Sequence, residues 1–268
     1  MVVQHNLTAM NSNRMLGLTT KAQASSTEKL SSGYKINRAA DDAAGLAISE
    51  KMRRQIRGLT QASANAEDGV SMVQTAEGAL NEVHDMLQRI NELAVKGANG
   101  TLTSSDRSYI DSEVQQLMSE INRVASTTTF NEVNLLSGSC SVNLQVGAEA
   151  NQIIALSIKG MNCSGLGLTG SANTVSSSNA LNVSVKSAIK ALNEQRSTLG
   201  AVQNRLEHTI NNLDNIVENT TSAESAIRDT DMATEMVTYS NYNILAQAGQ
   251  AMLAQSNQSN QGVLSLLG

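Results

Sequence analysis

Two adjacent carboxylates, Asp41 and Asp42, are the side chains that most resemble a catalytic acid/base pair. Acid–base chemistry needs groups of different proton affinity, and such a pair usually has a histidine, metal ligands or a phosphate-binding loop beside it. The sequence around the two residues supplies none of these. Helix capping together with an ion pair to Arg38 or Arg228 is the simpler role, because an Asp side chain accepts hydrogen bonds from the free N–H groups of a helix start. We therefore expect no catalysis.

Three histidines are the other candidates for chemistry. His5, His84 and His208 are widely separated and have no spacing typical of metal ligands. We expect all three to be solvent-exposed polar residues, with no metal ion and no cofactor bound.

The composition limits the classes of protein further. The net charge is −5, and the 24 acidic and 19 basic residues are intermixed, which argues against a nucleic-acid partner. No stretch approaches the ~20 apolar residues of a membrane span, so membrane insertion is not expected. The first residues lack the basic start and apolar centre of a cleaved signal peptide. The sequence therefore predicts a cytoplasmic protein or one that leaves the cell by a route without a cleaved signal.

The elements that must position these residues are mainly helices, since the chain contains no Pro and only 2% aromatic residues. The longest regular feature is a heptad stripe from Leu181 to Ile227, whose steps alternate between four and three residues. Its members are Leu181, Val185, Ala188, Leu192, Gln195, Leu199, Val202, Leu206, Thr209, Leu213, Ile216, Thr220, Ala223 and Ile227. Such a stripe predicts a long helix with a long helical partner.

Three further helices are expected. A second stripe, from Leu59 to Ala94, predicts a helix over about 43–96, which Asp41 or Asp42 would cap. A third helix should begin near 104–106 and end near 126–129. Residues 1–33 favour a helix of modest stability that Gly33 ends, because Gly suits the left-handed cap position.

A short β element separates the two halves of the chain. Apolar and polar residues alternate over 142–146 and over 154–158, which predicts a β-hairpin within about 130–160. A loop is expected over 160–180. If Ile154 pairs with Val146, Cys163 is a few residues out of register with Cys140, and a disulfide between the two cysteines stays open.

After Ile227 the apolar residues lie on more than one side of the expected helix. Met232, Met236, Tyr239 and Ala246 follow one side, and Val237, Ile244, Ala248 and Met252 follow another. A helix with two apolar faces needs neighbours on both, and this pattern indicates burial inside an assembly.

Several segments resemble bacterial flagellin in the order in which that family carries them. They are Leu30–Gly45, Leu199–Leu206, Ala223–Ala233, Asn243–Gly249 and Val263–Leu267. The resemblance covers essentially the whole chain and implies a mostly α fold, an elongated antiparallel helical bundle or coiled coil with a small β-hairpin region. The terminal helices would pair as an inner coiled coil.

The resemblance also implies a division into domains. Residues 1–42 and 228–268 would form an inner, discontinuous domain with its connector. Residues 43–227 would form a rod of long helices, in which a hairpin at about 130–160 and a short loop at 160–180 replace the variable outer domains of other members.

The implied function is a structural subunit that polymerises into the bacterial flagellar filament for swimming, with a hook–filament junction protein as the alternative. The implied partners are further copies of the chain, an export chaperone on the C-terminal helix, and the filament cap and hook-junction proteins. The subunit would be secreted by the flagellar type III apparatus. The candidate assembly residues are Leu7, Met10, Asp41, Asp42, Arg228, Met236, Ile244, Met252, Val263, Leu264, Leu266 and Leu267.

A second implied role concerns recognition of the monomer by a host. The stretch Gln88–Val95 resembles the segment that the flagellin-sensing Toll-like receptor grips, and Glu113 matches its acidic partner position. Arg89 would supply a bidentate fork, Leu93 an apolar plug and Glu113 a carboxylate. The expected receptor contacts are Gln88, Arg89, Glu92, Leu93 and Glu113. The same residues would also serve subunit packing, and the two roles are compatible.

Overall fold

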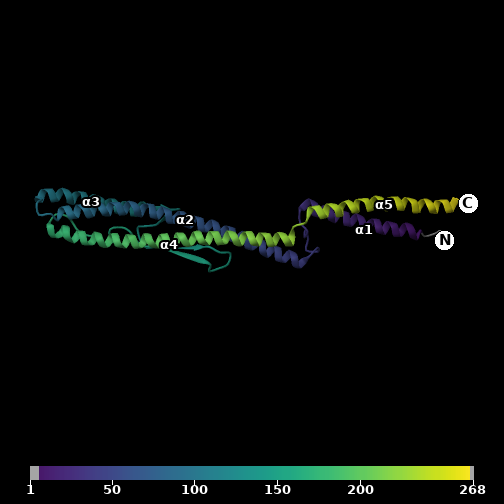
Figure 1. Ribbon diagram of the computed structural model, residues 1–268, viewed down its shortest axis with the longest axis horizontal. Helices are drawn as coiled ribbons and strands as arrows, with labels where there is room; N and C mark the ends of the chain where they lie inside the picture. Colours follow the sequence, from purple (N-terminus) through teal and green to yellow (C-terminus); the bar gives the residue numbers. More distant parts are fainter. Residues whose placement is uncertain (1–5, 266–268) are drawn as a thin grey trace. The chain divides into compact units, whose positions relative to one another are not determined.

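The structure is a computed structural model that describes residues 6–265, apart from the side chains of residues 260, 261 and 263–265. The described chain consists of five helices and two small antiparallel strand pairs (Figure 1). Its contacts divide it into two units. The described residues of 1–54 and 219–268 form the terminal unit, and residues 55–218 form the central unit.

The terminal unit is built on a pair of antiparallel helices, α1 (Leu7–Ser32) and α5 (Met232–Ser265). Asn6 Nδ2 donates to the Ser256 carbonyl at one end of the pair (3.2 Å). Ser26 Oγ donates to Glu235 Oε1 at the other end (2.5 Å). The predicted pairing of the terminal helices is confirmed.

Small residues bring α1 and α5 close together. A Cβ added at Gly249 would lie only 3.3 Å from Leu16 Cδ1, so the α5 backbone approaches that leucine directly. Ser26 and Ala246 are the buried members of the pair among the described residues. Gly33 ends α1 in the left-handed conformation (φ 76°), as the sequence predicts.

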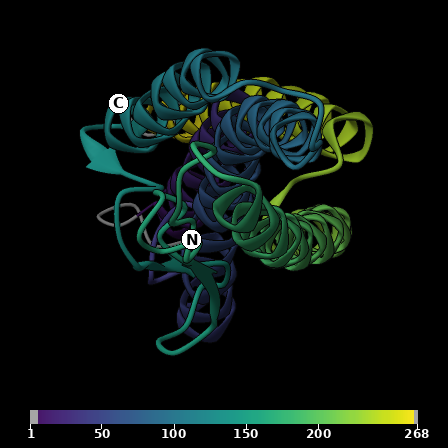
Figure 2. The ribbon, with the colours of Figure 1, turned by 90° about the vertical axis from the view of Figure 1, so that its left-hand side faces the viewer.

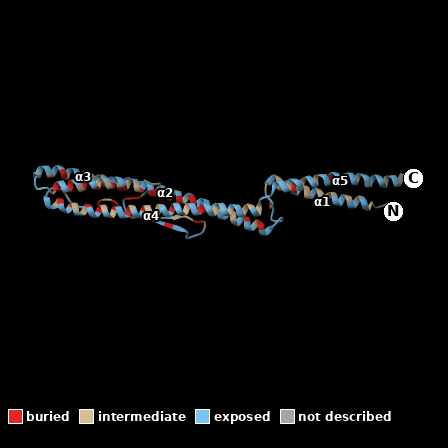
Figure 3. Cartoon of the chain, in the orientation of Figure 1, coloured by how far each residue is buried: buried red, intermediate tan, exposed pale blue. Residues whose placement is uncertain are grey.

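The central unit contains most of α2 (Ala43–Gly97) and of α4 (Val175–Arg228), with α3 (Ser104–Thr127) beside them. Figure 2 shows these three helices end-on, and Figure 3 shows buried residues recurring along them. Apolar side chains from all three helices form one core, which also takes in β4 and the loop before α4. Polar contacts add to it: Arg196 pairs with Glu77 at 3.5 Å.

The two heptad stripes meet in this core and in two smaller buried clusters, which contain Leu206 and the pair Leu59 and Leu213. On α4, the stripe residues Leu181, Val185, Ala188, Leu192, Gln195, Leu199, Leu206 and Leu213 are buried. On α2, the stripe from Leu59 to Ala94 contributes Leu80, Val83, Leu87 and Ile90, all fully buried. The predicted long helix and its long helical partner are therefore confirmed.

Helix α4 begins at Val175, and the expectation of a loop as far as residue 180 is wrong. A reciprocal cap explains the earlier start. Ser177 N donates to Thr174 Oγ1 (3.1 Å), and Thr174 N donates to Ser177 Oγ (2.9 Å). These bonds satisfy backbone N–H groups at the helix start and hold the Ser-rich first turn in helical conformation.

The predicted hairpin is present as β3 (Cys140–Gln145) and β4 (Ile153–Ile158), but its register differs from the expected one. Leu144 pairs with Ile154, so the expected Val146–Ile154 pairing is wrong by two residues. Val146 N donates instead to the Gln152 carbonyl (2.9 Å), which closes a shorter turn. The same face of β4 is nevertheless buried.

A second, smaller ribbon was not expected from the sequence. β1 (Thr129–Phe130) pairs with β2 (Val133–Asn134) around a two-residue turn. Asn131 and Glu132 in this turn both have positive φ, 46° and 66°. Positive φ at both positions is the requirement of a type I′ turn, which usually takes Asn followed by Gly.

Both cysteines are free, so no disulfide joins them in this structure. Cys140 lies opposite Ile158 in the hairpin. Cys163 is buried, and its Sγ donates to the Met118 carbonyl at 3.3 Å. Burial raises the pKa of the Cys163 thiol, which keeps it in the unreactive, protonated form.

Candidate assembly surfaces

The paired helices α1 and α5 expose large apolar side chains. These residues are 45–68% exposed: Leu7, Met10, Met15, Leu18, Met232, Met236, Val237, Ile244, Leu245 and Met252. Large exposed apolar surfaces mark sites that other molecules cover. The pattern matches the sequence-based expectation that this part of the chain needs neighbours beyond its own helices.

A groove runs between the two helices of this pair. It has a volume of about 310 Å³ and is lined by Met15, Leu16, Leu245, Gly249 and Met252, among others. Leu16 packs closely against Gly249 in this groove, and the longer side chains of Met15, Leu245 and Met252 also line it. An apolar side chain of another molecule could enter it.

Five of the expected assembly residues lie on this exposed surface: Leu7, Met10, Met236, Ile244 and Met252. Val263 and Leu264 belong to α5, but their side chains lie outside the described residues, as do Leu266 and Leu267 altogether. The assembly role of these residues stays a prediction.

Asp42 is the capping residue of α2. Its Oδ1 accepts hydrogen bonds from Ala44 N (3.1 Å) and Gly45 N (3.0 Å). Gly45 is required here because a Cβ would collide with Asp42 and with the buried side chain of Ile36. The predicted capping role is therefore confirmed for one of the two carboxylates.

Asp41 closes the turn before the helix. Its Oδ2 accepts from Arg38 N (2.9 Å) and Asn37 N (3.1 Å), and these two bonds lower the pKa of the Asp41 carboxyl. The expected ion pair to Arg38 or Arg228 is wrong. The Arg38 guanidinium is bound to Glu28 through two hydrogen bonds of 3.0 and 3.1 Å, and Arg228 binds another carboxylate.

Arg228, at the end of α4, contacts the segment between α1 and α2 and the first turns of α2 within the terminal unit. Its Nη1 donates to Glu50 Oε1 at 2.7 Å, and its guanidinium lies 4.7 Å from the Tyr34 ring centroid. Lys35 N donates to its carbonyl (2.6 Å). The hydrogen bond from Arg228 lowers the pKa of Glu50. Tyr34 and Glu50 were not expected from the sequence.

Three of the five expected receptor contacts, Arg89, Glu92 and Glu113, form a charged cluster across α2 and α3. Arg89 donates to Glu113 Oε1 from Nε (2.9 Å) and from Nη2 (2.8 Å), and to Glu92 Oε2 from Nη1 (3.2 Å). These carboxylates raise the pKa of Arg89. Gln88 is also exposed. Leu93 is only 3% exposed and lies in the core, so it does not form an exposed apolar plug in this structure.

The histidines have separate positions. His208 is exposed as expected. His84 is half-buried, which corrects the expectation of full exposure: its Nε2 lies 2.8 Å from Gln88 Nε2, and its Nδ1 is buried without a partner. His5 lies outside the described residues. Within residues 6–265, no group of three His, Cys, Asp or Glu side chains could hold a metal ion.

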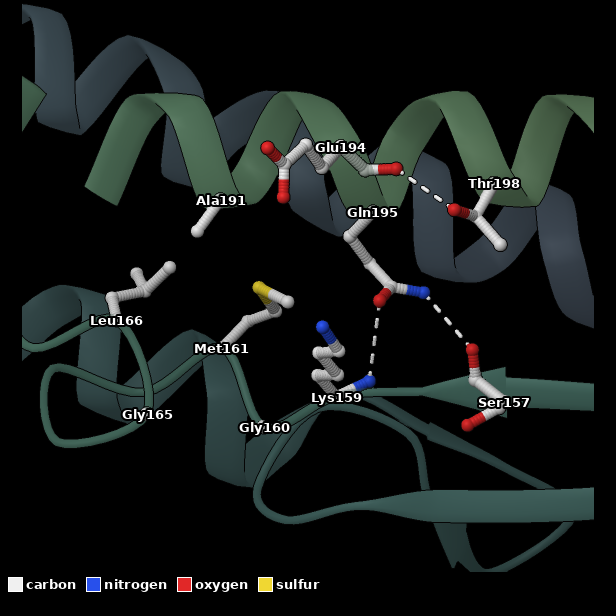
Figure 4. Close-up of a pocket in the computed structure, with 10 residues that line it drawn as sticks. All are labelled: Ser157, Lys159, Gly160, Met161, Gly165, Leu166, Ala191, Glu194, Gln195 and Thr198. Atoms are coloured by element: carbon white, nitrogen blue, oxygen red, sulfur yellow. Dashed lines mark hydrogen bonds between the residues drawn. The ribbon is translucent and has the colours of Figure 1, made fainter. Parts of the chain in front are cut away.

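A polar residue of the α4 stripe, Gln195, secures β4. Its Nε2 donates to the Ser157 carbonyl (3.0 Å), and its Oε1 accepts from Lys159 N (3.4 Å). Figure 4 shows this amide beside a hollow of about 280 Å³ that Met161 and Leu166 also line. The amide takes the place of a neighbouring strand, so its polarity serves packing.

No described helix has the length and apolar character that a membrane crossing would need. Two family models match the chain. Residues 3–141 match the model of the bacterial flagellin N-terminal helical region, and residues 183–267 match that of the bacterial flagellin C-terminal helical region.

Relatives align along the whole chain. A flagellin of Halalkalibacterium halodurans is 52% identical over 271 residues, and a flagellar filament 31.3 kDa core protein of Treponema maltophilum is 48% identical over 285 residues. Both alignments cover 100% of each chain. The crystal structure of Bacillus cereus flagellin aligns with a TM-score of 0.49 at 26% identity, covering 56% of this chain and 88% of that one. With both family models matched and full-length identities near one half, the chain belongs to the bacterial flagellin family.

Proposed function

We propose that this flagellin polymerises by burying the exposed apolar faces of α1 and α5 against other copies of the chain. As a flagellin, it is a structural subunit of the extracellular bacterial flagellar filament. The observation that carries the proposal is the exposure of Leu7, Met10, Met236, Ile244 and Met252 on a helix pair that has few buried residues of its own. Covering such side chains contributes about 25 cal/mol per Å² of apolar surface removed from water.

Charge substitution on the exposed face tests this proposal. Ile244 is 61% exposed, so Ile244→Asp should leave the monomer folded while placing a carboxylate in the buried interface. We expect seeded polymerisation to fail for this variant. Val183→Asp is the matched control, because Val183 is 66% exposed but lies on α4 in the central unit. The proposal is wrong if the Ile244 variant forms filaments as readily as the wild type.

A deletion gives a second test. A chain lacking residues 1–33 and 235–268 loses nearly all of the α1–α5 pair. We expect no filaments by electron microscopy after seeding, although the central core is intact. Abundant filaments from this chain would contradict the assigned role of the terminal helices.

Export and capping would use the same apolar residues before polymerisation. The proposed route is the flagellar type III apparatus, with a chaperone holding α5, followed by addition beneath the filament cap and next to the hook-junction proteins. In a binding assay with the purified export chaperone, Ile244→Asp should weaken binding, whereas Leu7→Asp on α1 should not. The two residues are similarly exposed, at 61% and 68%. Unchanged binding by the Ile244 variant would contradict α5 as the chaperone site, and a loss for the Leu7 variant as large as that for the Ile244 variant would show that the chaperone also needs α1.

Recognition by the flagellin-sensing Toll-like receptor is a second candidate function, favoured by the exposed cluster of Arg89, Glu92 and Glu113. Arg89 donates twice to Glu113 Oε1 and once to Glu92 Oε2, and such charge-assisted bonds hold its guanidinium in a defined position on the two helices. Arg89→Ala should lower receptor activation by purified monomer. Arg123→Ala is the control, since Arg123 is also exposed and paired with a glutamate, Glu120, on α3. Unchanged signalling by the Arg89 variant would remove this candidate.

A further inference from the structure

The turn between α2 and α3 contains Asn99 followed by Gly100, the one Asn–Gly pair in the sequence. We propose that Asn99 is a self-modification site that loses its side-chain amide. The Gly100 peptide nitrogen, after losing its proton to water or hydroxide, attacks Asn99 Cγ and forms a C–N bond. The amide nitrogen then leaves as ammonia, taking a proton from water. Hydrolysis of the cyclic imide adds one water and yields aspartate or isoaspartate.

The attacking nitrogen is accessible. Gly100 is exposed, and a Cβ built on it would have no atom within 4 Å. The last backbone bonds of α2 come from Ala98 N and Asn99 N, and no hydrogen bond from Gly100 N is present among the described residues. Among the described residues, the nitrogen is therefore held by no carbonyl, and no residue beyond its two chain neighbours crowds the Gly100 Cα.

The amide carbon that would be attacked is activated by the same turn. Thr101 N donates to Asn99 Oδ1 at 3.2 Å, which folds the carboxamide over the Gly100 peptide. Negative charge develops on this oxygen when the nitrogen adds to Cγ. A backbone N–H that already points at such an oxygen stabilises the addition, as oxyanion-hole donors do.

Arg107, in the first turns of α3, acts on the nucleophile. Its Nη2 donates to the Asn99 carbonyl (2.9 Å) and its Nε to the Gly97 carbonyl (3.1 Å). A cationic donor on the Asn99 carbonyl withdraws electrons from the Asn99–Gly100 peptide bond. The Gly100 N–H consequently becomes more acidic and gives up its proton more easily.

The product would change the turn chemically. A carboxylate would replace a neutral amide close to Arg107, and isoaspartate would add one methylene to the backbone that joins α2 to α3. The fraction of molecules converted at Asn99 would therefore increase with time after synthesis. Asn131, in the exposed turn between β1 and β2, provides an internal reference because the larger residue Glu132 follows it.

The test incubates the full-length protein at mildly alkaline pH and measures conversion of the Asn99 peptide by mass spectrometry after digestion. Labelling with isoaspartyl methyltransferase is a second readout. We expect conversion at Asn99 before Asn131, and at least as fast in folded protein as in urea. Gly100→Ala, which the open space permits, should slow the reaction roughly tenfold, equivalent to about 1.4 kcal/mol on the barrier, with unchanged circular dichroism.

Two results would overturn the proposal. Conversion in urea with an intact Asn99 in folded protein would show that the fold protects the residue. Equal rates for wild type and the Gly100 variant would show direct hydrolysis without attack by the backbone nitrogen. Arg107→Gln adds a finer test: a slower reaction in the folded variant, but not in urea, supports the activating hydrogen bond, and an unchanged folded rate contradicts it.

Discussion

The terminal and central units use the same kinds of residue in opposite ways. In the central unit, leucines such as Leu87, Leu192 and Leu199 are fully buried. In the α1–α5 pair, Leu7 and Leu245 are more than half exposed, while Ser26 and Ala246 occupy the contact between the helices. Hydrophobicity alone therefore does not decide burial. An apolar side chain is buried only where a neighbouring element covers its face of the helix. The helices α1 and α5 have apolar residues on more faces than their mutual contact can cover.

The largest expected effect separates a buried from an exposed leucine. Leu192→Ala should lower the free energy of unfolding by about 2–5 kcal/mol, because it removes packed atoms and leaves a cavity. Leu245→Ala, at a side chain 55% exposed, should change the monomer by no more than about 0.5 kcal/mol. Urea unfolding followed by circular dichroism measures both. Similar losses would erase the contrast between the units.

A smaller effect is expected at the polar position of the central core. Gln195→Ala leaves the Ser157 carbonyl and Lys159 N without their partner and should cost about 1–3 kcal/mol. Gln203→Ala is the control, since this glutamine bonds to exposed Glu207 on the same helix. A Gln195 variant as stable as wild type would show that the amide does not secure β4.

The turn between β1 and β2 offers a stabilising change. Glu132→Gly relieves a positive φ of 66° and should raise the free energy of unfolding by up to about 1 kcal/mol. Asn151→Gly, at φ 68°, should gain less, because Asn tolerates the left-handed region. Thermal unfolding compares the two variants. No gain at Glu132 would mean that its conformation carries no strain.

The smallest effect concerns pH and the connecting segments of the terminal unit. Hydrogen bonds lower the pKa of Asp41, Glu50 and Asp231 from ordinary values of 3.8, 4.5 and 3.8. Carboxylates with depressed pKa contribute stability that is present above those ordinary values and is lost as the pH falls through the folded pKa. Amide NMR signals of residues 33–42 should therefore broaden or shift below about pH 4. Glu50→Gln should reduce the change of these signals with pH. Broadening on raising the pH, rather than on lowering it, would contradict the expected direction.

The sequence predicts the long-range features of the fold well, because they repeat. The α4 stripe keeps one period over many turns, and eight of its fourteen members are buried as the pattern predicts, although Ala223 near its end is exposed. Gly33 likewise predicts the end of α1. The predicted register of β3 and β4 differs from the observed register by two residues. A slip of two preserves the alternation of apolar and polar residues, and so the pattern cannot detect it.

The positions that the sequence did not predict at the candidate sites also have local physical causes. Leu93 lies beside the stripe residue Ile90 and is buried because the core-facing surface of α2 is wider than a two-position seam. Tyr34 and Glu50 meet Arg228 from distant parts of the sequence, and no periodicity links them. Thr and Ser residues such as Thr174 and Ser177 occur in loops as well as in helix caps. Their residue types alone therefore do not show that α4 begins at Val175.

Hydrogen exchange measured on monomer and on filament tests the central claim most directly. Because α1 and α5 bury few side chains of their own, their amides should exchange rapidly in the monomer and become strongly protected in the filament. Amides of the buried stripes in the central unit should be protected in both states. Equal protection of α1 and α5 before and after polymerisation would contradict the account.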